Sequence, residues 1–200
     1  SIKMKRLVIG VTGASGVIYA IRLLEVLRGV ADVETHLVLS IAARQTIKYE
    51  TRYTVDEVTQ LADVRHPLKN IAASISSGSF KTMGMVVVPC SMKTLSGITH
   101  SYSDNLLLRA ADVTLKDRRP LVLLPRETPL HIGHLRMMVQ ATEMGAIILP
   151  PMPAFYHRPQ TINELVDQTV NRVLDVLDIE LKKELFERWK GKSMNGEIDL

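Results

Sequence analysis

The sequence predicts an α/β fold, a single doubly wound parallel sheet with helices on both faces. Short, continuously apolar runs alternate with longer segments of helical periodicity, which is the pattern of successive βαβ units. The length of 200 residues is enough for one domain and short for two. A composition of 46% hydrophobic and 23% charged residues is that of an ordinary globular protein.

The expected elements follow in chain order from the apolar runs and the helix signals. Buried strands are expected over residues 6–11, 33–39, 84–89, 120–125 and 146–149, and 63–70 leaves room for a short sixth. Helices are expected over residues 17–27, 41–51, 55–62, 104–118, 131–144 and 161–177. Five or six parallel strands joined by right-handed crossovers give a Rossmann-like or flavodoxin-like sheet.

Local signals support three of these helices. Thr54 and Glu57 form a capping box that begins the helix over 55–62, and Gly145 closes the helix over 131–144. The helix over 161–177 is amphipathic, with one apolar stripe that includes Leu165 and Val173. We expect a single domain over residues 1–190, followed by a flexible tail over 191–200.

Composition also narrows the function. Cys90 is the only cysteine, so no intrachain disulfide can form and a reducing, cytoplasmic location is expected. No apolar run approaches the ~20 residues that span a bilayer. The net charge is +4, and basic and acidic residues alternate without an aromatic-rich basic stripe. This pattern favours a phosphorylated small molecule over nucleic acid or a membrane as the partner.

Open α/β sheets bind ligands at the carboxyl ends of their strands, here the loops after residues 11, 39, 88, 124 and 149. The first loop runs from Gly10 to Gly16 and is either a phosphate cradle beside a helix N-terminus or a plain tight turn. Its spacing matches no P-loop. The second strand ends at Ser40 and not at the acidic residue that NAD binding requires, which argues against a nicotinamide cofactor.

The loops after residues 88 and 124 carry polar side chains, and two interpretations are open for each loop. Ser91 and Thr94 can cap the next helix only, or can also donate to a ligand. Cys90 has no base beside it in the sequence and is interpreted as a small buried hydrophobe. Arg126 and Glu127 lie between two prolines, and they either bind an anion and move a proton or form a loop ion pair.

The remaining candidates lie on the last loop and on two helices. Four prolines stiffen residues 150–159, where Phe155 and Tyr156 can wall an apolar ligand and His157 is expected at the surface. Arg109, Asp112 and Lys116 are spaced as a solvated salt-bridge row. Arg172 stands at the edge of its helix's apolar stripe, where it can be half-buried and reach an anion.

Six motifs in order resemble the flavin prenyltransferase family of the UbiX/Pad type. They are Thr12-Gly13-Ala14-Ser15-Gly16, Pro89-Cys90-Ser91, Arg109-Ala110-Ala111-Asp112-Val113, Arg119-Pro120-Leu121-Val122-Leu123, Pro125-Arg126-Glu127, and Phe155-Tyr156-His157 followed by Pro159. The resemblance covers residues 10 to about 189. It implies an enzyme that transfers a dimethylallyl group from dimethylallyl phosphate to N5 and C6 of FMN, without a metal. The product, prenylated FMN, would serve a UbiD-type decarboxylase.

The resemblance also implies roles for particular residues. Flavin contacts are expected from Gly13, Ala14, Ser15, Ser40, Ser91, Met92, Lys93, Thr94 and Arg126. The donor phosphate is expected to meet Lys116, Arg126, Tyr156 and Arg172, and proton handling is expected from Ser15, Glu50 and Glu127. Ser77, Arg109 and the C-terminal aromatic Trp189 are expected to line the site. Lys93 departs from the glycine that many family members carry there.

Two other functions stay open at this point. One is an FMN-dependent decarboxylase of aromatic acids, and the other is a non-catalytic flavin carrier, which the basic pI of about 9.2 argues against. The related cysteine decarboxylases carry an asparagine in the motif that here reads Pro89-Cys90-Ser91-Met92-Lys93-Thr94, so their reactions are disfavoured. The family forms trimers that gather into dodecamers, so we expect a homo-oligomer in which neighbouring chains share sites.

Overall fold

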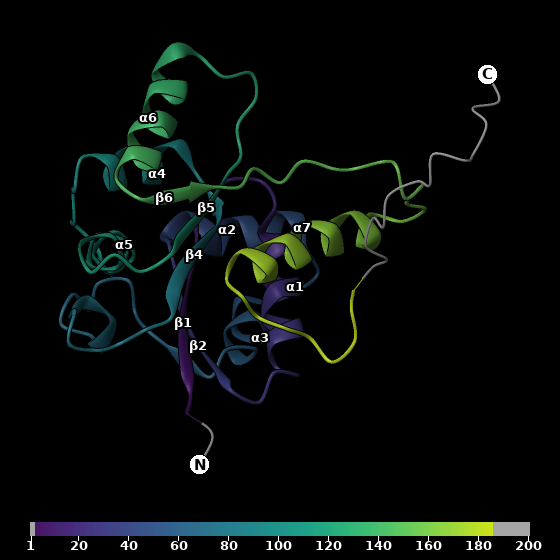
Figure 1. Ribbon diagram of the computed structural model, residues 1–200, viewed down its shortest axis with the longest axis horizontal. Helices are drawn as coiled ribbons and strands as arrows, with labels where there is room; N and C mark the ends of the chain where they lie inside the picture. The colour runs from purple at the N-terminus through teal and green to yellow at the C-terminus, as the bar shows by residue number, and fades with distance from the viewer. Residues whose placement is uncertain (1–2, 186–200) are drawn as a thin grey trace, which may run out of the picture.

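The computed structural model describes residues 3–185 and contains one six-stranded sheet whose strands are all parallel (Figure 1). The strands are β1 (Lys5–Val11), β2 (Val33–Leu39), β3 (Val64–Arg65), β4 (Gly84–Cys90), β5 (Leu121–Pro125) and β6 (Ala146–Ile148). Their order is β3-β2-β1-β4-β5-β6. The predicted fold class is confirmed. The order reverses between β1 and β4, which is the switch point where such sheets bind ligands.

The described residues form seven helices, and six of them match the expected segments within a few residues at each end; the helix over 92–99 was not among those segments. The helices are α1 (Val17–Leu27), α2 (Ile41–Glu50), α3 (Val55–Gln60), α4 (Met92–Thr99), α5 (Leu106–Lys116), α6 (Ile132–Glu143) and α7 (Ile162–Val176), with a 3-10 turn η1 at Ser74–Ser76. The capping box of Thr54 and Glu57 is present, and Thr161 with Glu164 forms another on α7. Gly145 has φ +109° after α6, a backbone conformation that favours glycine.

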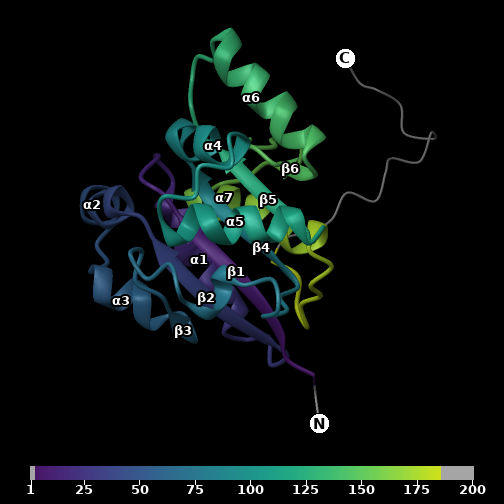
Figure 2. The same cartoon turned by 90° about the vertical axis from the view of Figure 1, so that its left-hand side faces the viewer.

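Two hydrophobic cores lie on opposite faces of the sheet, because successive strand side chains point to opposite sides. Leu7, Ile9 and Val11 of β1 pack with α1, α2, α3 and α7, whereas Val8 between them packs with α4, α5 and α6. Figure 2 shows α5 in front of the strands, with α4 and α6 above it in that view. With both faces covered, the strand ends are the exposed part of the sheet.

Some expectations concern residues that the structure does not describe. Trp189 and the tail over 191–200 lie outside the described residues 3–185. Within residues 3–185, no helix is long and apolar enough to cross a membrane.

Candidate functional site

The carboxyl edge of the sheet gathers the loops that the sequence singled out. The Ser40 N–H donates to the Val11 carbonyl at 2.9 Å, which joins the ends of β1 and β2. The Arg126 N–H donates to the Cys90 carbonyl at 3.2 Å, which joins the ends of β4 and β5. Residues 12–16, 40, 91–94 and 126–127 therefore lie along one edge, as predicted.

Thr12 ties the loop after β1 to the loop after β4. Its hydroxyl donates to the Pro89 carbonyl at 2.6 Å and accepts from the Ser91 N–H at 2.9 Å. Its exposed fraction is 1%, so both hydrogen bonds are shielded from water. One buried hydroxyl thus sets the spacing between the two segments that flank the switch point. Thr12 was not predicted to have a role of its own, because nothing in the neighbouring sequence indicates a contact with residues 77 and 79 positions away.

Helix α2 holds the glycine loop along one face, through residues spaced four apart. A Cβ atom at Gly13 would lie 2.4 Å from the Ala42 Cβ, so only glycine allows this approach. The Thr46 hydroxyl donates to the Gly13 carbonyl at 3.0 Å. Glu50 accepts from the Ser15 hydroxyl at 2.7 Å and from the Gly16 N–H at 3.0 Å. Ser15 and Glu50, far apart in sequence, are brought into direct contact.

The helix N-termini at this edge differ in how they are capped. Ser40 caps α2 by accepting from the Ala43 N–H at 3.0 Å, and Ser91 caps α4 by accepting from the Thr94 N–H at 3.2 Å. Helix α1 begins after Gly16, at φ +107°, with no side-chain cap. The Tyr19 N–H in its first turn donates to the Gly16 carbonyl at 3.1 Å, which leaves the N–H groups of Val17 and Ile18 available to an anionic group beside the glycine loop. Ser91 acts as the predicted cap and also donates to the Thr94 hydroxyl at 3.0 Å.

Arg126 and Glu127 are both exposed after β5. The ion pairs found within residues 3–185 include none between them, so the alternative of a loop ion pair has no support in this structure. Glu127 instead accepts from the Thr128 N–H at 3.0 Å. Both charged side chains thus project at the edge without neutralising each other.

Tyr19, which the sequence analysis did not select, lies between the glycine loop and α7. Its ring is about 3.0 Å from the position of a Cβ at Gly16. Burial raises the pKa of the Tyr19 phenol, while the positive charge of Arg126 and a hydrogen bond with Thr169 oppose that rise. These contacts place the phenol near Arg126 and near the helix that carries Arg172. No periodicity signal distinguishes such a tyrosine from a core residue.

A cavity of about 210 Å³ lies where the loop after β6 meets α7. Tyr156 from the loop and Arg172 from the helix both line it, together with Gln168 and Thr169. The Arg172 side chain is 71% exposed and lies 3.8 Å from Asp175, so the expectation that it is half-buried was wrong. Because the helix presents it outward at the cavity rim, the guanidinium remains open to an anion.

Two predicted site residues, Lys116 and Ser77, lie away from the carboxyl edge of the same chain. Lys116 ends α5 near the start of β5, and its amine lies 3.0 Å from the position of a Cβ at Gly78, in the loop that contains Ser77. Its partner is Asp117 at 2.9 Å, whose pKa this hydrogen bond lowers. Arg109 pairs with Asp112 at 3.4 Å. Of the salt-bridge row expected for Arg109, Asp112 and Lys116, only the Arg109–Asp112 pair is formed.

Arg119 fastens the serine-glycine loop at this amino edge, donating to the Gly78 carbonyl at 2.8 Å and to the Phe80 carbonyl at 3.2 Å. The seven residues of β4 separate the two edges by about 20 Å at ~3.3 Å per residue. Lys116 and Ser77 therefore cannot join Arg126 within one subunit.

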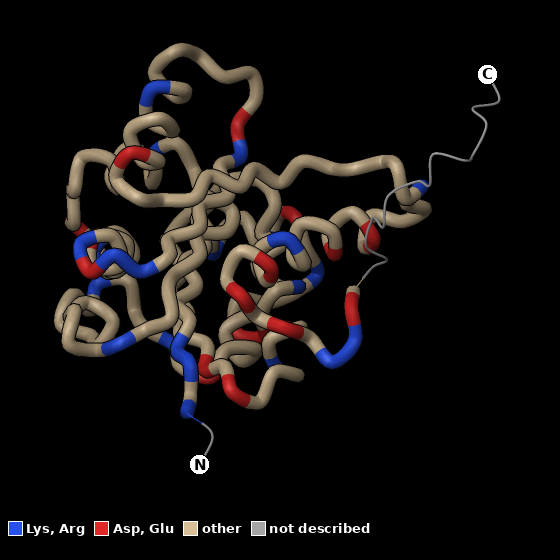
Figure 3. Tube along the Cα trace, viewed as in Figure 1, with Lys and Arg blue, Asp and Glu red and all other residues tan. Residues whose placement is uncertain are grey.

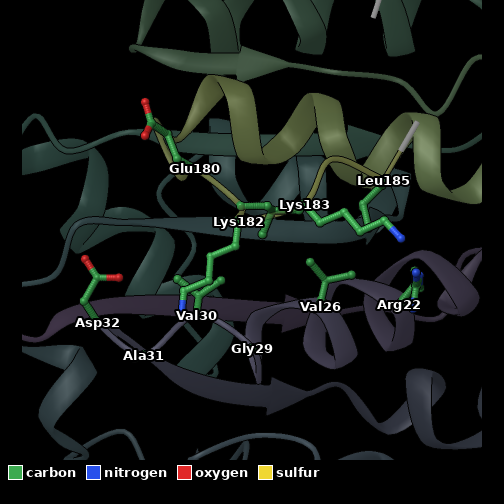
Figure 4. A pocket seen from close by; sticks show the side chains of 11 residues that line it. Arg22, Val26, Gly29, Val30, Ala31, Asp32, Glu180, Lys182, Lys183 and Leu185 are labelled. Carbon is green, nitrogen blue, oxygen red and sulfur yellow. The ribbon is translucent and has the colours of Figure 1, made fainter. Parts of the chain in front are cut away.

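A cavity of about 690 Å³ lies away from both groups of residues. It lies between α1, the turn after α1 and residues 180–185, and its lining includes Arg22, Val30 and Lys182 (Figure 4). Lys and Arg are interspersed with Asp and Glu along the chain, as the sequence indicated (Figure 3). Neither the volume of a cavity nor the distribution of charged residues would by itself have located the carboxyl-edge site.

Cys90 is fully buried at the end of β4, and burial raises the pKa of its thiol to about 12. The thiol stays protonated near neutral pH, which confirms the interpretation of Cys90 as a buried hydrophobe. Within residues 3–185, no group of three or more His, Cys, Asp or Glu side chains could hold a metal ion.

Comparison with known proteins agrees with these features. The Flavoprotein family model matches residues 1–174. Flavin prenyltransferase UbiX of Escherichia coli (strain K12) is 65% identical over 188 residues, covering 94% of this chain and 100% of that protein. The chain belongs to the UbiX family of flavin prenyltransferases.

Solved structures of UbiX proteins have the same fold. AnUbiX (PadA1), crystallised in complex with FMN and dimethylallyl pyrophosphate, is 50% identical with a TM-score of 0.92 and covers 96% of this chain and 100% of its own. The dodecameric FMN-dependent Ubix-like decarboxylase from Escherichia coli O157:H7 is 49% identical with a TM-score of 0.90, covering 93% and 100%. Family membership and fold therefore rest on nearly the whole chain.

Proposed function

We propose that this protein is a flavin prenyltransferase that joins the dimethylallyl group of dimethylallyl phosphate to N5 and C6 of FMN, without a metal. The observation that carries the proposal is the convergence, at the carboxyl edge, of the α1 N-terminus at Gly16, the Ser15–Glu50 pair and Arg126. Its product is prenylated FMN, which a UbiD-type decarboxylase would take up. Identity of 65% to flavin prenyltransferase UbiX supports the assignment.

The residues at this edge fit FMN. The uncapped amides of α1 suit a phosphate dianion, and Arg126 adds a positive charge beside them. The remaining flavin contacts in the proposal are small or hydroxyl-bearing residues that leave room for a ring system, with Met92 and Lys93 beginning α4. They are Gly13, Ala14, Ser15, Ser40, Ser91 and Thr94. FMN, when bound, supplies the nucleophilic N5 and C6 atoms of the reaction.

The donor phosphate belongs beside Tyr156 and Arg172 in the cavity between the last loop and α7. When the carbon–oxygen bond of dimethylallyl phosphate breaks, the bonding electrons remain on the phosphate oxygen. Arg126 and Arg172 stabilise this negative charge, and the Tyr156 hydroxyl donates a hydrogen bond to it. The dimethylallyl cation released by this step is then held beside the flavin position.

Proton handling belongs to Ser15, Glu50 and Glu127. The Ser15 hydroxyl donates to Glu50 at 2.7 Å, so a proton can pass from serine to carboxylate along an existing hydrogen bond. Because its own proton is engaged, the Ser15 oxygen presents its lone pairs toward the site as an acceptor. Glu127 projects from the end of β5 and offers a second carboxylate for removing a ring proton.

Each site is completed by a neighbouring subunit in this proposal. Lys116 and Ser77 lie about 20 Å from the carboxyl edge of their own chain, and we place them at the donor phosphate and flavin of a neighbour. Large apolar side chains are exposed on α6 and the last loop, with Val139 at 59% and Phe155 at 67%, as association requires. The Ubix-like decarboxylase structure is dodecameric, and we propose the same assembly here.

The direct test is the mass of the flavin after the protein is incubated with reduced FMN and dimethylallyl phosphate. A gain of one five-carbon unit is expected. Release of carbon dioxide from an aromatic acid by this protein alone, with unchanged flavin mass, would favour a decarboxylase instead. A parallel reaction with dimethylallyl pyrophosphate, the compound bound in the AnUbiX complex, establishes which donor is preferred.

Mixed assemblies test the shared site. Lys116→Ala and Arg126→Ala each remove one half of the site, so each homo-oligomer should be inactive. Co-refolded mixtures should regain activity, because some sites then combine an intact carboxyl edge with an intact Lys116. Mixtures that stay inactive would contradict a site shared between chains.

The proposal also includes a cytoplasmic location for one flavoprotein domain. The single, deeply buried Cys90 suits a reducing compartment. Cell fractionation with a tagged full chain checks the location, and recovery in a secreted fraction would contradict it.

A further inference from the structure

Gln168 of α7 holds the middle of the loop between β6 and α7 to the helix. Residues 150–159 contain four prolines, which offer no N–H donor, and the loop carries Tyr156. The Ala154 N–H donates to the Gln168 Oε1 at 2.9 Å, and the Gln168 Nε2 donates to the Ala154 carbonyl at 2.9 Å. A single amide thus satisfies both backbone polar groups of one loop residue.

Gln168 lies on α7 close to Arg172, the residue proposed to bind the donor phosphate. Gln168 precedes Arg172 by four residues, so both side chains lie on the same face of the helix. Gln168, Arg172 and Tyr156 all line the cavity of about 210 Å³. The two hydrogen bonds between Gln168 and Ala154 therefore set the distance between the loop that carries Tyr156 and the helix that carries Arg172.

We propose that Gln168 is a positioning residue for the donor phosphate, which holds the loop so that Tyr156 and Arg172 face the same anion. This inference rests on the proposed function. Without the two hydrogen bonds, the loop would have to be ordered again each time the donor binds, and that ordering would weaken binding. The proposed flavin contacts lie on the loops after β1, β2, β4 and β5 and not on the loop after β6, so FMN affinity should not depend on Gln168.

Gln168→Met tests the proposal, because methionine has a similar length and cannot form either hydrogen bond. Asp167→Asn is the matched control on the same helix: it weakens the contact to Arg22, 2.6 Å away, without touching the loop. Donor affinity is measured by titrating the FMN-loaded protein with dimethylallyl phosphate, together with KM and kcat. We expect Q168M to raise the donor Kd and KM by about tenfold and to leave the FMN Kd within twofold. D167N should change neither.

Two further measurements separate positioning from general destabilisation. Hydrogen exchange in the peptide over 150–160 should be faster in Q168M than in D167N, a readout that needs no activity. The double variant Q168M/Tyr156→Phe should lose no more donor affinity than the weaker-binding single variant, because Gln168 acts through the loop that carries Tyr156.

Several outcomes would overturn the inference. Unchanged exchange would show that the amide does not hold the loop, and faster exchange with wild-type donor affinity would show that holding it does not matter. A parallel loss of FMN and donor would mean that α7 has moved. A wild-type protein that leaves the flavin mass unchanged would contradict the proposed function itself, which separates the two failures.

Discussion

Thr12→Val should both destabilise the protein and weaken FMN binding. Valine keeps the shape of threonine but has no hydroxyl, so the Pro89 carbonyl and the Ser91 N–H each lose the partner seen at 2.6 and 2.9 Å. A buried polar group left without its partner costs about 1–3 kcal/mol, so the two together cost about 2–6 kcal/mol. At 2–4 °C per kcal/mol, this corresponds to a fall in Tm of roughly 4–24 °C.

The assay compares Thr12→Val with Thr12→Ser, which keeps the hydroxyl and loses only a methyl group. Urea unfolding of the apoprotein at fixed protein concentration gives the stability, and fluorescence titration gives the FMN Kd. Because Thr12 spaces Gly13 from Ser91, we expect the valine variant to lose about tenfold or more in FMN affinity and the serine variant to stay near wild type. Equal behaviour of the two variants in both assays would refute the role assigned to the hydroxyl.

Three other predictions concern single side chains. Arg172→Ala should weaken dimethylallyl phosphate binding by about ten- to a hundredfold, since a charge-assisted contact contributes roughly 1.5–3 kcal/mol. The same variant should leave FMN affinity unchanged. Calorimetric titration of each ligand checks this, and unchanged donor affinity would make Arg172 an ordinary surface residue. Glu127→Gln should retain FMN and assembly but slow prenylation in single-turnover assays, whereas equal losses of flavin and stability would indicate a structural role. Cys90 should resist iodoacetamide in the native protein at pH 8 and react after unfolding, because burial raises the pKa of its thiol to about 12; mass spectrometry detects the adduct, and rapid native alkylation would contradict this.

The sheet was predictable because its strands are apolar runs bounded by turn residues, and burial on both faces demands such runs. The short β3 was only suspected, since two residues, Val64 and Arg65, at a sheet edge carry almost no pattern. Helix α4 was located only by its cap Ser91, because Ser96 and Gly97 interrupt the helical signal.

The site was predictable where polar residues follow strands, as with Ser15, Ser91 and Arg126. Contacts between distant segments were not, since Thr12 reaches 77 residues to Pro89 and its neighbours in sequence give no sign of that. The Lys116 contact differed from the expected row because α5 ends at this residue and the chain turns, which brings Asp117 within 2.9 Å.

The direct junction between β2 and α2 makes the spacing of the chain there as important as its residues. Ser40 alone links Leu39 to Ile41, so the rotation of α2 about its axis is determined by where β2 ends. An insertion of one residue at this junction would turn the helix by about 100° relative to the sheet. Ala42, Thr46 and Glu50 would then leave the glycine loop together, although none of them had been replaced. A residue inserted after Glu50 would leave the same three contacts in register. We therefore expect the protein to tolerate an insertion after Glu50 but not one at Ser40, although the two sites are only about a dozen positions apart.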